Sequence, residues 1–284
     1  MSILQNKIDF VALVTVENAN PNGDPLNGNR PRLTSEGYGE ISDVCIKRKL
    51  RNRLQDLGER IFVQSNERRD DAYDSLSDRA RGEIKDYTNG NDYATLACEK
   101  WFDVRAFGQV FAFKGDKENS SVSVGVRGPV TLHQAMSINP IDIDSIQITK
   151  SVNSEHTKDG KKSSDTMGTK HMVRFGLYKI KGSINVQLSE KTGFSEEDAE
   201  KIKKCLSTLF INDCSAARPD GSMEVIELYW WKHNDKTGQY SSKQVHDSLQ
   251  IKLKDGIIYP HSIDDFEVTL ETLNGLTPEI IHGI

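Results

Sequence analysis

The densest group of side chains able to do chemistry is a basic run at residues 44–53, VCIKRKLRNR, with five lysines and arginines and no acid. Such a run suits contact with phosphates, because a purely solvated helix face usually interleaves both signs of charge to form i,i+4 ion pairs. A solvated basic face is the alternative, since such faces are common on proteins. The run by itself leaves both interpretations open.

A turn-rich segment precedes this run, at residues 18–31, and reads NANPNGDPLNGNRP. Its backbone N–H groups, together with Asn20, Asn22 and Arg30, are suited to lining a sugar-phosphate track. A connector that uses Asn, Gly and Pro only to turn the chain would have the same composition. The segment is therefore a candidate for binding nucleic acid and does not decide the question.

Two further arginines stand close to glycines, Arg105 just before AFGQVF and Arg127 within GVRGPV. Glycines in strands usually mark bulges or turns, but they also allow a ligand to approach the backbone closely. Arginine and aromatic side chains on one sheet face suit single-stranded RNA, which is held by stacking and by backbone contacts. We therefore include both arginines among the candidate RNA contacts.

Residues 153–171, NSEHTKDGKKSSDTMGTKH, are polar and contain too few apolar side chains to pack a core. We expect a projecting hairpin or a mobile loop there. Met167, between Thr166 and the nearby His171, would be placed to wedge between bases, as apolar side chains do in other nucleic-acid-binding proteins. Plain disorder is the alternative for this segment.

The sequence contains no recognisable catalytic motif. Its seven histidines are dispersed and form no H-E-x-x-H, and G-x-S-x-G and Walker patterns are missing too. The four cysteines lack zinc-type spacing. Asp24, Asp43, Asp103 and the pair Asp142/Asp144 are candidates for a Mg²⁺ or acid/base site, although turns and strand ends use aspartate for other reasons. We expect no enzyme, no cofactor and no metal.

The hydrophobic pattern predicts the elements that hold these residues. IDFVALVTVE, at residues 8–17, indicates a mostly buried strand. In the next element, a cap at Ser42 or Asp43 precedes a helix whose apolar residues recur along one stripe, at Ile46, Leu50, Leu54 and Leu57. Lys47, Arg48 and Arg51 lie off this stripe, and we expect their replacement by glutamate to leave the fold intact.

The acidic segment 64–99 predicts a helical, solvated insertion that is interrupted by Asn-Gly at residues 89 and 90. Alternating apolar residues predict strands at 101–113, 121–132, 141–152, 172–188, 224–233, 249–256 and 266–273. Ser195 and Asp198 have capping-box spacing at the start of another helix. This order of elements favours an α+β fold, a ferredoxin-like sheet with helices on one face.

Length and charge set the outer bounds. The chain has 284 residues, 36% hydrophobic and 28% charged, which suits one elaborated domain or two. We find no basic-then-apolar leader and no apolar stretch near the ~20 residues that span a bilayer, so we expect a cytoplasmic protein with no membrane contact. The net charge of −5 argues against coating phosphate through bulk charge, so the placement of cations must matter.

Several segments carry a resemblance to one family. These are NPNGDP with the basic helix SDVCIKRKLRN, then WFDVRAFGQVFA, VGVRGPV with HQAMSINPI, and TKHMVRFGLYKIKG. In this order and spacing they resemble the backbone subunit of the subtype I-C CRISPR Cascade complex, in the repeat-associated mysterious protein (RAMP) superfamily. The resemblance runs from about residue 8 to beyond 230, and the last fifty residues add little to it.

The resemblance implies one elaborated domain over residues 1–284. Its parts would be an RNA-recognition-motif-like palm, a helical finger insertion at 60–100 and a thumb hairpin at 153–171. It also implies a non-catalytic role in antiviral defence, in which copies stack head to tail along a CRISPR RNA (crRNA), beside other Cascade subunits. Each thumb displaces one base so that the rest of the guide can pair with target DNA.

The resemblance also assigns roles to residues of this chain. The basic helix would bring Lys47, Arg48 and Arg51 to phosphates, and the 18–31 segment would bring Asn20, Asn22 and Arg30. The remaining implied contacts are Arg105 and Arg127 along the RNA track, and Thr166, Met167 and His171 in the thumb.

Two other function classes stay open at this point. Related backbone subunits of other CRISPR types cut bound target RNA with a loop aspartate, so a metal-dependent ribonuclease acting on guide-paired RNA is the enzymatic alternative, with Asp24 as its candidate. A protein-binding adaptor, whose basic helix meets an acidic partner, is the other.

A cleavage assay separates the first alternative from a non-catalytic scaffold. Purified protein with guide, labelled complementary RNA and Mg²⁺ should leave the RNA intact, because the sequence provides no recognisable catalytic set. Cleavage that Asp24→Ala abolishes would establish the ribonuclease instead.

Overall fold

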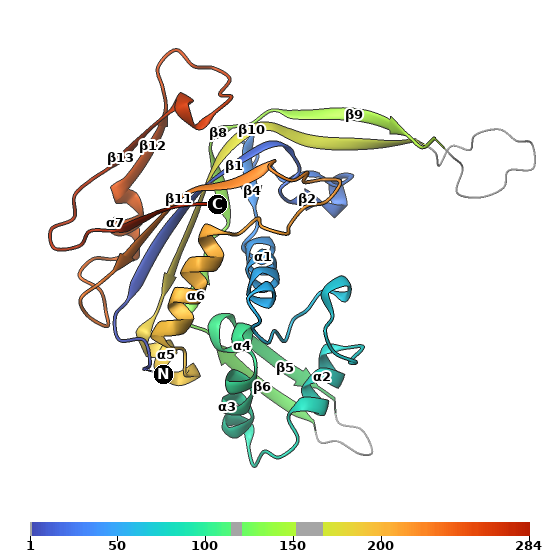
Figure 1. The fold of residues 1–284 in the computed structure, drawn as a ribbon, viewed down its shortest axis with the longest axis vertical. Coiled ribbons are helices and arrows are strands. Elements are labelled where there is room, and N and C mark those ends of the chain that lie inside the picture. Colours follow the sequence, from blue (N-terminus) through green and yellow to red (C-terminus); the bar gives the residue numbers. More distant parts are fainter. Residues whose placement is uncertain (1, 115–120, 152–166) are drawn as a thin grey trace, which may run out of the picture.

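The structure, a computed structural model, describes residues 2–114, 121–151 and 167–284. Its centre is an eight-stranded antiparallel sheet in the order β14-β11-β1-β10-β8-β4, with β7 and β9 also paired to β10 (Figure 1). The strands of this sheet are β1 (Ile8–Ala19), β4 (Tyr38–Ile41), β7 (Val130–Leu132), β8 (Ala135–Pro140), β9 (Ile143–Thr149), β10 (Met167–Ile184), β11 (Met223–Lys232) and β14 (Glu279–His282).

Strand β1 lies between the two longest partners, β10 and β11, and its first residue pairs with Ile184 on one side and Lys232 on the other. Its side chains enter two different cores: Phe10 and Val14 face one, and Val11 and Leu13 face the other. A strand covered on both faces needs apolar residues at successive positions, which explains the continuous run in the sequence. The predicted buried strand is confirmed.

Two helices cover the first face, α1 (Asp43–Asp56) and α6 (Glu196–Ser207). The predicted stripe of α1 is confirmed, with Ile46, Leu50 and Leu54 buried and Leu57 packed at its edge. The side chain of Ser42 caps α1, and Ser195 with Asp198 forms a complete capping box on α6. Along the chain, the elements β1, α1, β8, β10, α6 and β11 follow the β-α-β-β-α-β order.

The second face is covered as well. Helix α7 (Ser242–Ser248) and the two-stranded sheet of β12 (Leu249–Leu253) and β13 (Phe266–Leu270) pack there. Their apolar residues Val245, Leu249 and Phe266 share a cluster with Trp231 and Leu177 of the central sheet. The sequence predicted helices on one face of the sheet, and this prediction is wrong, because the apolar second face of β1 also needs to be covered.

A separate body, which we call the finger, projects from the end of α1 (Figure 1). It contains α2 (Leu76–Glu83), α3 (Gly90–Lys100), α4 (Phe102–Phe107), and a hairpin of β5 (Gly108–Phe113) with β6 (Val122–Arg127). These elements share a third hydrophobic cluster built on Phe62, Tyr93, Trp101 and Phe111. The cluster contains residues on both sides of position 100, where the sequence placed the end of the insertion, so this body continues beyond the predicted boundary.

The predicted strand at 101–113 is wrong over its first half, where α4 forms. Phe102 and Ala106 of this helix enter the core beneath the central sheet, whereas Trp101 and Val104 enter the finger core. A helix can direct side chains into two cores on its different sides. Packing into both cores favours the helix here, and an alternating apolar pattern in so short a segment does not distinguish strand from helix. The strands at β5 and β6 form, but outside the central sheet.

Strand β9 and the first half of β10 form a long two-stranded hairpin that projects from the sheet (Figure 1). Its register pairs Met167 with Thr149 and Val173 with Ile143. Of the predicted 153–171 segment, residues 167–171 lie in this hairpin, and residues 153–166 lie outside the described residues.

The shorter elements complete the chain. They are β2 (Gly23–Asp24), η1 (Pro25–Asn27), β3 (Arg30–Pro31), η2 (Asn66–Arg68), α5 (Val186–Thr192) and η4 (Ile263–Asp265). Asn89 caps α3, so the Asn-Gly pair begins a helix as well as ending the preceding segment. Within the described ranges, every helix is too short or too polar to cross a bilayer.

Gly182 tests how tightly the sheet is packed. A Cβ at this position would lie well inside contact distance of the Phe10 ring and the Thr131 carbonyl oxygen. We expect Gly182→Ala to lower the free energy of unfolding by about 1–3 kcal/mol through overpacking. Urea denaturation measures it, with Gly125→Ala as the control, because nothing lies within 4 Å of a Cβ there. Equal stabilities of the two variants would contradict the packing shown.

Candidate nucleic-acid interface

The 18–31 segment is fixed to the start of α1 by Asn22. Its side-chain oxygen accepts hydrogen bonds from the backbone N–H and from the hydroxyl of Ser42, both at 2.9 Å. The Ser42 hydroxyl oxygen in turn accepts from the N–H of Cys45, which caps the helix. Asn22 thus holds the loop against the first turn of the basic helix, where the helix dipole favours anions.

Asn20 closes the same loop from inside. It is 4% exposed, and its side-chain amide donates to the carbonyl of Asn29 at 2.7 Å. Its backbone N–H donates to the carbonyl of Ala217, which brings in a second loop from beyond α6. This burial makes Asn20 a brace inside the loop, whose exposed part is residues 25–29.

Arg30 connects the loop to the projecting hairpin. Its Nη1 lies 2.9 Å from the Ser145 hydroxyl on β9 and 3.2 Å from Nδ1 of His171 on β10. The Ser145 hydroxyl is also 2.9 Å from the same ring nitrogen. The structure therefore brings together Arg30 and His171, two predicted site residues that are 141 positions apart in the chain.

The three predicted cations of α1 have different surroundings. The side chain of Lys47 is 24% exposed, and among the described residues its ion-pair partner is Asp43, one turn before it, at 3.0 Å. Arg48 donates to the Val63 carbonyl at 2.7 Å, and burial lowers its pKa. Arg51, 12% exposed, donates to the buried Asp103 at 2.9 Å.

These contacts correct one expectation about the helix. Arg48 and Arg51 lie off the apolar stripe but are not free on a solvated face, since both are bound to the first residues of the finger or to its carboxylate. Reversing their charge would place glutamates beside Asp103 and break buried hydrogen bonds. The fold is therefore not expected to tolerate the triple reversal, and only Lys47 is suited to such a test.

The other two predicted arginines lie away from the loop. Arg105 makes a two-pronged ion pair with Asp198 of α6, both distances being 2.9 Å. Arg127 is exposed and lines a groove of about 420 Å³ with residues of α3 and α5, among them Lys191. Arg105 is thus occupied inside the protein, whereas Arg127 is available to a ligand.

In the hairpin, Met167 begins the described part of β10 and is 59% exposed. Thr166 lies outside the described residues. The face of the hairpin that carries Met167 also carries Thr169 and His171, because alternate residues of a strand share a face. The predicted thumb residues that the structure describes therefore point to the same side as Arg30.

Asp24, the candidate for ribonuclease chemistry, has a local role. Its carboxylate accepts from the N–H of Leu26 at 3.1 Å and caps η1, and Arg32 lies 4.0 Å away. Across the described ranges, no group of three or more His, Cys, Asp or Glu side chains could hold a metal ion.

The sequence reasoning missed the loop after α6 as part of this surface. Arg218 in that loop and Lys49 of α1 both donate to Asp213. Burial lowers the pKa of Lys49, which also lies over the ring of Phe210. A single arginine in the turn sequence RPDG gave no periodic signal, so only the tertiary contact with Asn20's loop could reveal it.

A sequence profile of the family described as CRISPR-associated protein Cas7 matches residues 6–271. The chain belongs to the CRISPR-associated protein Cas7 family. A CRISPR-associated protein Cas7 from Haloferax volcanii is 28% identical over 215 residues, which cover 69% of this chain. The match spans 62% of that relative's own length.

Two solved structures share the fold. A chain of a CRISPR RNA-guided surveillance complex in a pre-nicking state is 14% identical, with a TM-score of 0.50 and coverage of 83% of both chains. A chain of another CRISPR RNA-guided surveillance complex is 16% identical, with a TM-score of 0.50, covering 89% of this chain and 78% of the other. At these identities the similarity shows the fold.

The ion pair between Arg105 and Asp198 makes stability depend on pH. Burial raises the pKa of Asp198, but hydrogen bonds from Arg105 and from the Ser195 N–H outweigh it, so the pKa lies below its usual value. A lowered pKa adds stability above the pKa of the unfolded chain, and this stability is lost as pH falls. Asp198→Asn should cost about 3 kcal/mol at pH 7 and much less in acid.

Denaturant unfolding at pH 7 and near pH 3 measures the difference. Asp255→Asn is the matched control, because Asp255 is exposed in the turn between β12 and β13. If the cost of Asp198→Asn were the same at both pH values, the ion pair would not be the source of the stability.

Proposed function

We propose that this chain is the crRNA-coating backbone subunit of a CRISPR surveillance complex, of subtype I-C. Membership of the Cas7 family supports this, together with one structural observation. The 18–31 loop, the first turns of the basic helix and the projecting hairpin come together at one place, through Asn22 with Ser42 and Arg30 with His171. A backbone of RNA laid along this junction would meet cations and N–H groups from all three elements.

In this proposal the central sheet is an RNA-recognition-motif-like palm. The β-α-β-β-α-β order of β1, α1, β8, β10, α6 and β11 supports that assignment. The finger and the hairpin of β9 and β10 are the insertions on this palm, and the hairpin is the thumb. All three belong to one elaborated domain.

Among the described residues, the proposed RNA contacts follow from accessibility. Lys47, Arg30 and His171 contact the RNA backbone, Met167 acts on the bases, and Arg127 extends the track. Thr166, outside the described residues, is assigned to the bases from the resemblance alone. Asn20 and Asn22 shape the loop whose backbone faces the ligand. A surface of this kind reads charge and shape, so it binds guides of any sequence alike.

The partners follow from the same role. The crRNA carries the sequence information and pairs with target DNA, while the protein holds the backbone. Copies stack head to tail through a heterologous contact that does not close, which produces an open helical filament capped by other subunits. No step in this role requires catalysis, and the use of Asp24 as a helix cap accords with a structural part for that carboxylate.

A pair of lysine substitutions tests the proposal. Lys47→Gln should weaken binding of single-stranded RNA whatever its sequence, and should reduce the slope of log affinity against log salt by about 1. Lys243→Gln is the control, because Lys243 also pairs with an aspartate one turn away but lies on α7, on the other face of the sheet. Electrophoretic mobility shifts across a salt series give both quantities.

The wild-type protein purified from cells should also carry nucleic acid, seen as a raised absorbance at 260 nm relative to 280 nm. Clean protein that fails to shift labelled RNA at low salt would support the adaptor role instead. Loss of binding for one RNA sequence only would contradict a contact that holds backbone.

A further inference from the structure

The finger joins α1 through a short strap, Phe62 and Val63, whose backbone polar groups are bound by charged side chains of three helices. The carboxylate of Asp103 in α4 accepts the N–H of Phe62 at 2.7 Å and the N–H of Val63 at 3.1 Å. Arg79 of α2 donates to the Phe62 carbonyl at 2.8 Å, and Arg48 of α1 donates to the Val63 carbonyl at 2.7 Å. Every backbone polar group of the strap thus has a charged partner.

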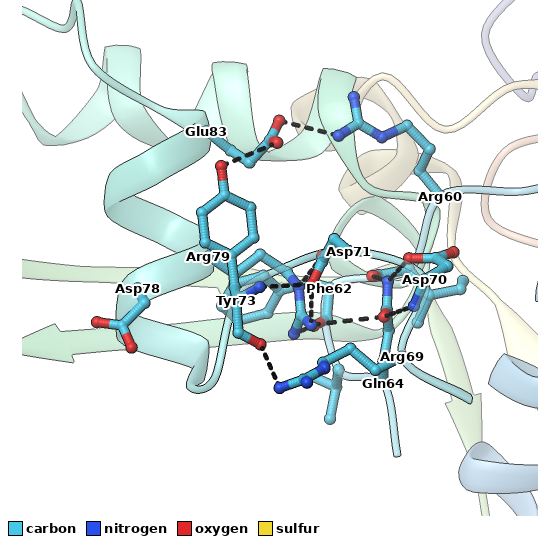
Figure 2. Close-up of polar contacts among 12 residues, drawn as sticks. Arg60, Phe62, Gln64, Arg69, Asp70, Asp71, Tyr73, Asp78, Arg79 and Glu83 are labelled. Carbon is cyan, nitrogen blue, oxygen red and sulfur yellow. Dashed lines mark hydrogen bonds and ion pairs between the residues drawn. The ribbon is translucent and has the colours of Figure 1, made fainter. Parts of the chain in front are cut away.

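The charged partners are themselves held in place. Arg51 of α1 donates to Asp103 at 2.9 Å, and its guanidinium lies over the ring of Phe107. Figure 2 shows Arg79 in contact with both Phe62 and Asp71. Its guanidinium makes a two-pronged ion pair with the Asp71 carboxylate, at 2.6 and 2.9 Å. These side chains are largely buried: Asp103 is 1%, Arg79 5% and Arg51 12% exposed.

Burial decides what such an arrangement does. Charge-assisted hydrogen bonds shielded from water are strong and directional, and breaking one leaves a buried charge without its partner. The strap also packs the Phe62 ring against Trp101 and Phe111, which contact each other in the finger core. The contacts that cross from α1 to the finger are those of Arg48 with Val63 and of Arg51 with Asp103, so a rotation of the finger about the end of α1 would break these two.

We propose that Asp103, Arg48 and Arg51 are positioning residues that fix the finger at a set orientation to the basic helix, and so set how the next copy docks along the RNA. This inference rests on the proposed function, because it assigns a consequence to the finger's orientation in the filament. It gives Arg48 and Arg51 a role different from the phosphate contact that the sequence suggested. Lys47, on the accessible side of the same helix, keeps that contact.

The partition depends on which groups reach α1 from the finger. Arg48 and Arg51 both contact the strap or Asp103, whereas Lys47, four positions before Arg51, pairs with Asp43 among the described residues. Helix α1 itself stays seated through Ile46, Leu50 and Leu54. We call the hydrogen bonds of Asp103, Arg48 and Arg51 at the strap the clamp. Loss of the clamp should loosen the finger without moving Lys47, the cation proposed to face the RNA.

The test compares Asp103→Asn with Lys47→Gln in the full chain. In the protein without RNA, deuterium exchange of the segment 60–66, read by mass spectrometry, should accelerate about tenfold or more in Asp103→Asn and stay unchanged in Lys47→Gln. Affinity for an RNA that holds one copy should stay within about twofold for Asp103→Asn and fall for Lys47→Gln. On an RNA that holds several copies, Asp103→Asn should lose its cooperative binding.

Unchanged exchange in 60–66 would overturn the clamp, and equal loss of affinity on short and long RNA would overturn the positioning role. If the wild type binds no RNA, the proposed function fails, while the exchange result still decides whether the clamp exists. If Asp103→Asn does not fold, Arg48→Gln replaces it, because it removes one hydrogen bond and leaves Asp103 in place. Arg48→Gln that behaves as Lys47→Gln would show a phosphate contact instead.

Discussion

Strand β1 is the element on which the rest of the structure depends. It pairs with β10 along one edge and β11 along the other, and its two faces enter two separate cores. Over residues 8–14 this strand has no free edge and no free face, so a polar side chain there needs a partner inside the protein. Asp9 shows the consequence: it is fully buried and is held by Lys7 at 2.9 Å and by His233 at 2.8 Å. Its pKa is lowered because those hydrogen bonds outweigh burial.

The same principle governs the arginines and lysines of this acidic chain. Many of them are tied to carboxylates inside the fold, as in the pairs of Arg51 with Asp103 and Arg105 with Asp198. Cations used in this way set the positions of helices and loops. Others, including Lys47 and Arg127, have accessible side chains on the surface. This division explains how a protein with a net charge of −5 can present a local basic surface to a polyanion.

The finger and the sheet are coupled through a short helix and a two-residue strap. Helix α4 places Phe102 in one core and Val104 in another, so the two hydrophobic clusters share a rigid connector. The strap adds directional hydrogen bonds to this apolar joint. An insertion held only by apolar contacts could slide, whereas one whose backbone groups are bound by buried charges has a single orientation.

The sequence by itself determined the local elements whose signals are periodic or chemical. The run at residues 8–17, the stripe of α1 and the capping box at Ser195 each specify one conformation, because burial and capping act within a few residues. The resemblance in NPNGDP and TKHMVRFGLYKIKG pointed to a CRISPR-associated protein, and the profile match shows the Cas7 family. It also singled out Arg30 and His171, although nothing in the chain order implied that they meet.

Only the tertiary structure decided which cations are bound to groups from other parts of the chain. Arg48, Arg51 and Lys47 look equivalent on a helical wheel, and their difference arises from Asp103 and Val63, which reach α1 from the finger. The helix at 102–107 was decided in the same way, by two cores on either side of it. A sequence pattern indicates which residues are apolar enough to be buried and which are charged. The partner of each charged residue depends on long-range packing, which brings together residues that are far apart in the chain and share no local pattern.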